Sequence, residues 1–99
     1  MRRLVVTRTA RAEIEAAFDW YLPRSPDAAA RFLAAVDAAI SEIESSPERF
    51  PVIQGSLRRR LLSAFPYGVY YKLYPTVVSV VGVVHGHRHP EEWLRRAEP

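Results

Sequence analysis

The sequence predicts an α+β domain in which a helical hairpin packs on a small antiparallel sheet. In the first half, apolar residues recur at helical spacing, whereas the second half carries apolar runs of strand length. The change falls at the proline- and glycine-containing stretch 47–56, which reads as a loop. The expected order is β-α-α-β-β-β in one domain, residues 1–99, optionally closed by a short C-terminal helix.

The first elements are a short strand and a helix. The run LVV at 4–6 is rich in β-formers, and Thr7 or Thr9 can cap the helix that follows. Pro23 and Pro26 then disfavour its continuation. Trp20 and Tyr21 are expected to pack the helical hairpin. The helix's apolar stripe consists of Ala10, Ile14, Ala17, Phe18 and Tyr21.

The second helix has clear start signals. Ser25 is a good N-cap, Pro26 suits the first helical position, and Asp27 suits the positive end of the helix dipole. The helix should run to about Ser45, and the short link before it predicts an antiparallel hairpin. Its apolar stripe consists of Ala29, Phe32, Leu33, Val36, Ile40 and Ile43.

Three strands are expected after the loop, at 58–65, 67–74 and 77–85. Their short links predict an antiparallel meander. The last run, VVSVVGVVH, is apolar on both faces, which predicts an interior strand. Beyond it, Pro90 can open the short C-terminal helix, and Trp93 can anchor that segment against the sheet.

Charge is distributed unevenly along the chain. The net charge is +3 and the pI about 9.7, and the basic excess lies entirely in the second half. That balance suits an anionic partner, such as nucleic acid or an acidic protein segment, or else a solvated basic face. No signal peptide or membrane-length apolar run is present, so we expect a cytoplasmic protein without a membrane partner.

The three histidines of the chain alternate at His85, His87 and His89, with Arg88 among them. Same-face positions on a strand are about 7 Å apart, too far for three imidazoles to share one metal. We therefore expect no metal, and with no Gly-rich phosphate loop, no cofactor. Two readings stay open: acid–base catalysis of RNA cleavage by His85, His87 and Arg88, or a non-catalytic strand edge that binds an anion or partner.

Two other features could contact a partner. In RRR at 58–60, Arg58 and Arg60 should face one side of a strand and Arg59 the other. Such arginines can meet phosphates, pair with an acidic protein, or keep an edge strand soluble. The tyrosines of 67–74 could stack on bases, although cross-strand packing is favoured.

The segments AEIEAAFDWYLPRSPDAAARFLAAVDAAISEIESSPERFP, RRRLLSAFPYGVYYKLY and VVGVVHGHRHPEEWLRR together resemble the RelE/ParE superfamily. These proteins are toxins of type II toxin–antitoxin modules, often described as plasmid stabilization proteins. The resemblance covers nearly the whole chain. It implies neutralisation by an antitoxin whose C-terminal segment wraps the toxin, and hence a hetero-oligomer.

The superfamily divides by target. RelE-like members cleave mRNA on the ribosome without a metal, whereas ParE-like members poison DNA gyrase. Here Arg59 and His87 or Arg88 fall near basic positions of the nucleases, but Trp93 stands near their usual tyrosine. Gly68 stands where they carry arginine. These two departures favour the ParE-like reading.

The resemblance thus implies a non-enzymatic toxin that inhibits gyrase. The alternatives are a ribosome-dependent mRNA endonuclease and a degenerate member that binds antitoxin with little toxicity. In the nuclease alternative, the catalytic residues would be His85, His87, Arg88 and Arg59. The residues expected to bind the antitoxin or target are Arg58, Arg60, Arg88, Trp93, Arg95 and Arg96.

Overall fold

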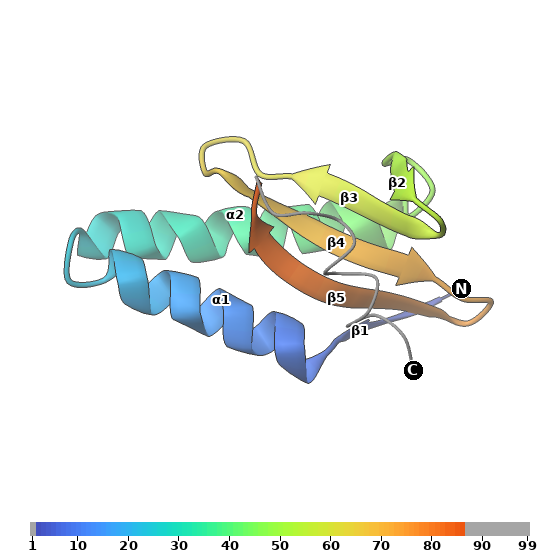
Figure 1. The fold of residues 1–99 in the computed structure, drawn as a ribbon, viewed down its shortest axis with the longest axis horizontal. Coiled ribbons are helices and arrows are strands. Elements are labelled where there is room, and N and C mark those ends of the chain that lie inside the picture. The colour runs from blue at the N-terminus through green and yellow to red at the C-terminus, as the bar shows by residue number, and fades with distance from the viewer. Residues whose placement is uncertain (1, 87–99) are drawn as a thin grey trace.

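The computed structural model describes residues 2–86, in which two helices pack on one face of a five-stranded sheet (Figure 1). The predicted α+β class is confirmed, with the helical hairpin as one layer and the sheet as the other. In chain order the elements are β1 (Arg3–Val6), α1 (Arg8–Tyr21), α2 (Pro26–Ser45), β2 (Val52–Gln54), β3 (Leu57–Leu61), β4 (Tyr67–Leu73) and β5 (Val77–His85).

Hydroxyl side chains cap the start of both helices. The Thr7 Oγ1 accepts a hydrogen bond from the Ala10 amide at 3.1 Å, so Thr7 rather than Thr9 is the cap of α1. The Ser25 Oγ likewise accepts from the Ala28 amide at 3.1 Å. Each cap satisfies an amide that has no partner within its own helix. Neither helix is long and apolar enough to cross a membrane.

The strand order is β1-β5-β4-β3-β2. The antiparallel meander of β3, β4 and β5 is confirmed. The first strand differs from the prediction, because β1 runs parallel to β5, with Arg3 opposite Val77 and Val6 opposite Val80. The sheet is therefore mixed. Short links dictate the direction of neighbouring strands, but no local link joins β1 to β5, so the sequence carried no signal of their direction.

Part of the predicted loop 47–56 is a strand. β2 pairs with β3, with Val52 opposite Arg58, at the edge of the sheet away from β1. Gly55 turns the chain between the two strands with a φ of 55°, a left-handed conformation that favours glycine. The three residues of β2 are too few for a recognisable alternation, which is why the sequence missed the strand.

The main core lies between the helices and the sheet. Its centre is the Phe32 ring, whose centroid lies 5.6 Å from those of Tyr21 and Phe65 and 5.2 Å from that of Tyr67. Leu33 belongs to the predicted apolar stripe of α2, but it is 36% exposed. The α2 side chains that are buried are Ala29, Phe32, Val36, Ala39 and Ile43.

A second apolar cluster lies on the face of the sheet away from the helices, called the open face below. Val81 joins this cluster through a β-bulge: Tyr70 lies opposite Gly82 and Tyr71 opposite Val80, which leaves Val81 as the extra residue of β5. β5 is thus an interior strand that is apolar on both faces, as predicted. The cluster consists of Ile53, Leu57, Tyr70, Val81 and Val84.

Candidate functional site

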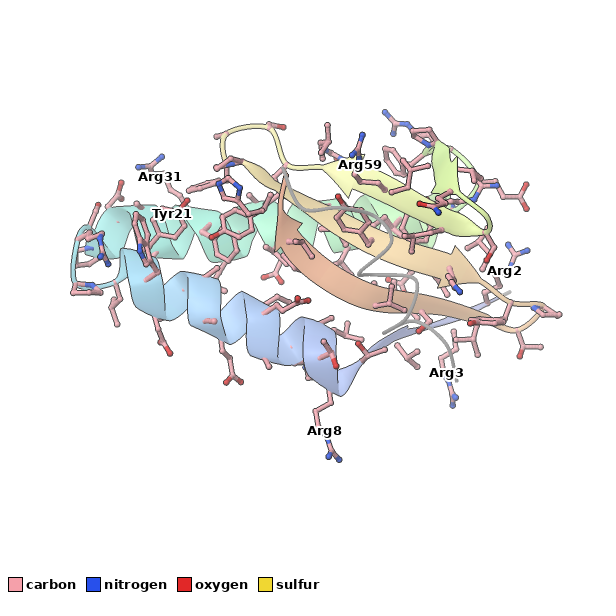
Figure 2. All side chains as sticks on the ribbon, in the orientation of Figure 1. Arg2, Arg3, Arg8, Tyr21, Arg31 and Arg59 are labelled. Atoms are coloured by element: carbon pink, nitrogen blue, oxygen red, sulfur yellow. The ribbon has the colours of Figure 1, made fainter. Side chains whose placement is uncertain are left out.

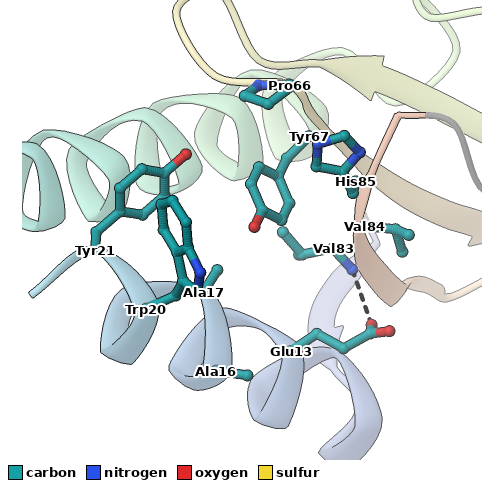
Figure 3. Close-up of a pocket in the computed structure, with 10 residues that line it drawn as sticks. All are labelled: Glu13, Ala16, Ala17, Trp20, Tyr21, Pro66, Tyr67, Val83, Val84 and His85. Atoms are coloured by element: carbon teal, nitrogen blue, oxygen red, sulfur yellow. Dashed lines mark hydrogen bonds between the residues drawn. The ribbon is translucent and has the colours of Figure 1, made fainter. Parts of the chain in front are cut away.

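A groove of about 440 Å³ lies between α1 and the adjoining ends of β4 and β5 (Figure 3). Its floor is mostly apolar, since alanines of α1 face valines of β5 across it. We call it the α1 groove. The residues that line it are Glu13, Ala16, Ala17, Trp20, Tyr21, Pro66, Tyr67, Val83, Val84 and His85.

Trp20 stands at the rim of the α1 groove. Its side chain is 53% exposed, so the prediction that Trp20 packs the helical hairpin is wrong, whereas Tyr21 does contact the aromatic core. The Arg24 guanidinium carbon lies 4.0 Å from the Trp20 ring centroid, and Arg24 Nη1 donates to the Trp20 carbonyl at 2.6 Å. An exposed indole with a cation on its face gives this rim an apolar and a positive component.

Glu13 closes the other end of the groove. β1 pairs with β5 only as far as Val80, and beyond that point α1 lies beside the strand. The Val83 amide donates to Glu13 Oε1 at 3.1 Å, shown as the dashed line in Figure 3. A carboxylate of the helix therefore satisfies an amide at the edge of the sheet.

The arginines of β3 face as predicted, with Arg58 and Arg60 on the helix side. Arg58 Nη1 donates to the carbonyls of Glu48 and Phe50, at 3.1 and 2.7 Å. Arg60 Nε donates to Glu42 Oε1 at 3.0 Å, and this bond lowers the pKa of the Glu42 carboxyl. Arg58 thus connects the segment after α2 to the sheet, and Arg60 connects α2 itself to the sheet. A role for these arginines in partner binding stays a prediction.

Tyr71 holds the same segment from β4. Its side chain is fully buried, and its hydroxyl donates to the Pro47 carbonyl at 2.7 Å. Burial raises the pKa of the Tyr71 phenol above its ordinary value of 10.0, because the phenolate would lose its hydration. Tyr70 and Tyr71 are 1% and 0% exposed, so neither ring is free to stack on a base. The prediction that these tyrosines pack within the sheet is confirmed.

A pH dependence of stability follows from Tyr71. Since its pKa is raised on folding, the unfolded chain loses this proton first, and stability should fall as the pH rises above about 10. We expect Tyr71→Phe to cost about 1 kcal/mol at pH 8, for the lost hydrogen bond. The variant should also lose less stability than the parent between pH 8 and pH 11, measured by urea unfolding. Equal losses in both proteins would contradict the assignment.

Arg59 lies on the open face and occupies the space beside Gly68. A Cβ atom at Gly68 would lie 3.2 Å from Cγ and Cδ of Arg59 and 3.2 Å from Cε1 of Tyr70. The absence of a side chain at Gly68 therefore lets Arg59 pack flat across β4. An arginine at position 68, as in the nuclease pattern, would have to displace Arg59.

The structure separates the two described members of the nuclease set. His85 lines the α1 groove, with its ring centroid 5.5 Å from that of Tyr67, whereas Arg59 lies on the open face. Within residues 2–86 there is no group of three His, Cys, Asp or Glu residues that could hold a metal. The remaining predicted site residues lie outside the described residues: His87, Arg88, Trp93, Arg95 and Arg96.

The α1 groove is the feature that the sequence reasoning missed. Four of its α1 residues, Glu13, Ala16, Ala17 and Trp20, follow the spacing i, i+3, i+4, i+7 and widen the apolar stripe of the helix, with which they share Ala17. That spacing could have revealed the groove. The groove was not predicted because this set begins with an acidic residue, Glu13, and because Trp20 was expected to be packed inside the hairpin.

A helical hairpin on one face of a small mixed sheet agrees with the predicted RelE/ParE class of toxins. Residues 4–90 match the family model described as ParE toxin of type II toxin-antitoxin system, parDE, so the chain belongs to this family.

A solved structure titled as a chromosomal ParDE toxin–antitoxin system from P. aeruginosa has a similar fold, with a TM-score of 0.77. Its sequence identity to this chain is 17%, and the alignment covers 86% of this chain and 96% of that one. No curated protein matches the chain significantly in sequence.

Proposed function

We propose that this ParE-family toxin inhibits DNA gyrase without catalysing a reaction and is neutralised by a cognate antitoxin. Its membership of the ParE family carries the proposal. The geometry supports a non-enzymatic action, because Arg59 and His85 lie on different sides of the sheet and cannot act on one phosphate. The glycine at position 68 supports it further, since it leaves the third strand without the arginine of the nuclease pattern.

The antitoxin docks in the α1 groove. Its floor offers an apolar surface at Ala16, Ala17 and Val83, large enough for one or two apolar side chains. Trp20 is an exposed tryptophan at the rim, the residue type most often found to dominate binding energy at an interface. The site therefore suits an anchor residue on the partner rather than a diffuse charged contact.

The charges at the groove indicate the chemistry of the antitoxin segment. The Arg24 guanidinium is held over Trp20 by its hydrogen bond to the Trp20 carbonyl, so the positive charge of the rim is positioned before the partner arrives. The chain as a whole carries a net charge of +3. An amphipathic antitoxin segment with an apolar anchor and a flanking carboxylate complements this surface.

Gyrase is contacted by the basic C-terminal residues Arg88, Arg95 and Arg96. They contribute three of the fourteen cationic side chains of the chain, within its last twelve residues. Such a concentration of guanidinium groups suits a carboxylate-bearing protein surface, with bidentate pairing at each arginine.

The target is tested by adding the purified toxin to a gyrase supercoiling assay and, in parallel, to a translating ribosome system read by primer extension. We expect loss of supercoiling and intact mRNA. The double variant Arg95→Glu/Arg96→Glu should weaken the inhibition at least about tenfold, equivalent to 1.4 kcal/mol.

The matched control carries the same charge change elsewhere. Arg3 and Arg8 are exposed and point away from the body of the protein (Figure 2). The variant Arg3→Glu/Arg8→Glu should inhibit gyrase like the parent. Unimpaired supercoiling together with cuts in the mRNA would reject the gyrase proposal in favour of the ribosome.

A further inference from the structure

A second pocket, of about 360 Å³, lies where the outer edge of β3 meets the segment that follows α2. In the strand order, β4 separates β3 from β5, and the pocket shares no residue with the α1 groove. We call it the arginine pocket. Its lining includes Glu42, Arg49, Phe50, Arg59, Arg60 and Leu61.

The positive charges of the arginine pocket outnumber its negative charge. Arg60 is paired, since its Nε donates to Glu42 Oε1 at 3.0 Å. Among residues 2–86, neither Arg49 nor Arg59 forms a salt bridge. The pKa of the Glu42 carboxyl is lowered first by the hydrogen bond from Arg60 and also by the charge of Arg49, so Arg49 acts on the same pocket. Two guanidinium charges of the pocket are therefore left without a carboxylate in the described part of the chain.

Contacts with uncharged groups hold the arginines of the pocket in place. The guanidinium carbons of Arg49 and Arg60 lie 5.1 and 5.6 Å from the Phe50 ring centroid. The aliphatic part of Arg59 lies over Gly68, whose missing side chain leaves the space for it. Such contacts position a guanidinium without neutralising it, and its N–H groups stay available for a bidentate carboxylate. The pocket is therefore preorganised for an oxyanion.

The outer edge of β3 is open beside the arginine pocket. β2 pairs with β3 only as far as Arg58, and the Arg59 amide donates to the Pro51 carbonyl at 3.2 Å. Amides alternate between the two sides of a strand, so the Leu61 amide points to the same edge as that of Arg59, beyond the end of β2. The Leu61 carbonyl already accepts a hydrogen bond from Arg60 Nη1. Within residues 2–86 no strand lies beside the Leu61 amide on this edge, so a further strand can pair there.

Exposed aliphatic side chains flank the arginine pocket. Leu61 of its lining is 50% exposed, and Val52, which follows the lining residue Pro51, is 49% exposed. Burying these side chains is favourable against apolar groups and not against phosphates. Together with the open edge, they favour a polypeptide, in which acidic and apolar side chains can alternate, over the phosphate backbone of a nucleic acid.

We propose that the arginine pocket binds an extended acidic segment of a partner protein. Carboxylates of the segment pair with Arg49 and Arg59, an apolar side chain covers Leu61, and a backbone carbonyl accepts from the Leu61 amide. The segment thereby adds a strand beside β3. This contact is separate from the α1 groove and from the action of the toxin on its target, so it goes beyond the proposed function.

The test uses the full-length toxin and a fluorescein-labelled heptapeptide of alternating glutamate and leucine, with binding followed by fluorescence anisotropy. We expect Arg49→Gln/Arg59→Gln to weaken binding at least about tenfold, because both partners of the carboxylates are lost. The matched control Arg3→Gln/Arg8→Gln removes the same charge from exposed positions outside the pocket and should bind like the parent. A peptide with glutamine in place of glutamate should also bind at least about tenfold more weakly.

Hydrogen exchange tests the strand pairing. The Leu61 amide should exchange at least about tenfold more slowly when the peptide is bound. The Leu4 amide is the matched control, since Leu4 lies on β1 at the opposite edge of the sheet. The amides of Arg3 and Thr7 face β5, so that of Leu4 faces away from it, and its exchange should not change.

Equal affinity of the parent and Arg49→Gln/Arg59→Gln, or an equal loss in Arg3→Gln/Arg8→Gln, would overturn the proposal. So would unchanged exchange at Leu61 in the peptide-bound toxin. Displacement of the labelled peptide by a ten-nucleotide thymidine strand at a lower concentration than by unlabelled peptide would also overturn it, because the pocket would then prefer phosphates. Neither gyrase inhibition nor antitoxin binding is part of the readout, so failure here and failure of the proposed function are distinguishable.

Discussion

Replacing Phe32 with alanine should lower the free energy of unfolding by about 3–5 kcal/mol. Phe32 is fully buried, and its ring contacts Tyr21, Phe65 and Tyr67 at centroid distances of 5.2–5.6 Å. The change removes the contacts of this ring with Tyr21 of α1, Phe65 of the loop before β4 and Tyr67 of β4, and it leaves a cavity. For a domain of this size, the melting temperature should fall by about 15–30 °C, measured by calorimetry or circular dichroism.

The neighbouring residue Leu33 provides the control. It lies on the same helix and loses a similar amount of side chain in Leu33→Ala, but it is 36% exposed. We expect this change to cost less than about 1 kcal/mol, as is usual for partly exposed positions. Equal losses in the two variants would mean that the aromatic cluster around Phe32 is not the centre of the core.

Replacing Ala16 with arginine should weaken antitoxin binding at least about a hundredfold, equivalent to roughly 2.7 kcal/mol. Ala16 is exposed and lines the α1 groove, so a long side chain there fills the space that the antitoxin's anchor would enter. The melting temperature of the toxin alone should stay within a few degrees, because no buried contact is lost.

Affinity can be measured by calorimetric titration with the cognate antitoxin. Ala38→Arg places the same side chain on α2, which contributes no residue to the α1 groove, and should bind like the parent. If Ala16→Arg binds as tightly as Ala38→Arg, the antitoxin does not use the α1 groove, and the ParE-family assignment stands without this docking site.

The helical half of the fold was predictable almost to the residue. The N-cap of α2 at Ser25, its first residue Pro26 and its end at Ser45 were all read from the chain, because caps and helical periodicity depend on neighbours within a few residues. The strands β4 and β5 were found for the same reason, whereas β3 ends at Leu61 and not at the predicted residue 65. The exposure of Trp20 and Leu33 was not predicted, because it depends on what packs against a residue and not on its hydrophobicity.

The candidate site was predicted less well than the fold. The sequence pointed to two groups, the histidines and the arginines Arg58, Arg59 and Arg60, and the members of each group lie close along the chain. In three dimensions His85 faces the α1 groove, Arg59 lies flat over Gly68, and the other two arginines hold the segment after α2. Strand alternation and the sheet order separate residues that the sequence brings together.

By itself the sequence determined the α+β class, the helical hairpin and the resemblance to the RelE/ParE superfamily, since these rest on local periodicity and motifs spread along the chain. Only the tertiary structure decided that β1 runs parallel to β5 and that α1 and β5 enclose a groove with Trp20 at its rim. It alone revealed a second apolar cluster on the open face of the sheet. These features arise from contacts between residues far apart in sequence, whose pairing is set by the burial of apolar surface in the assembled fold.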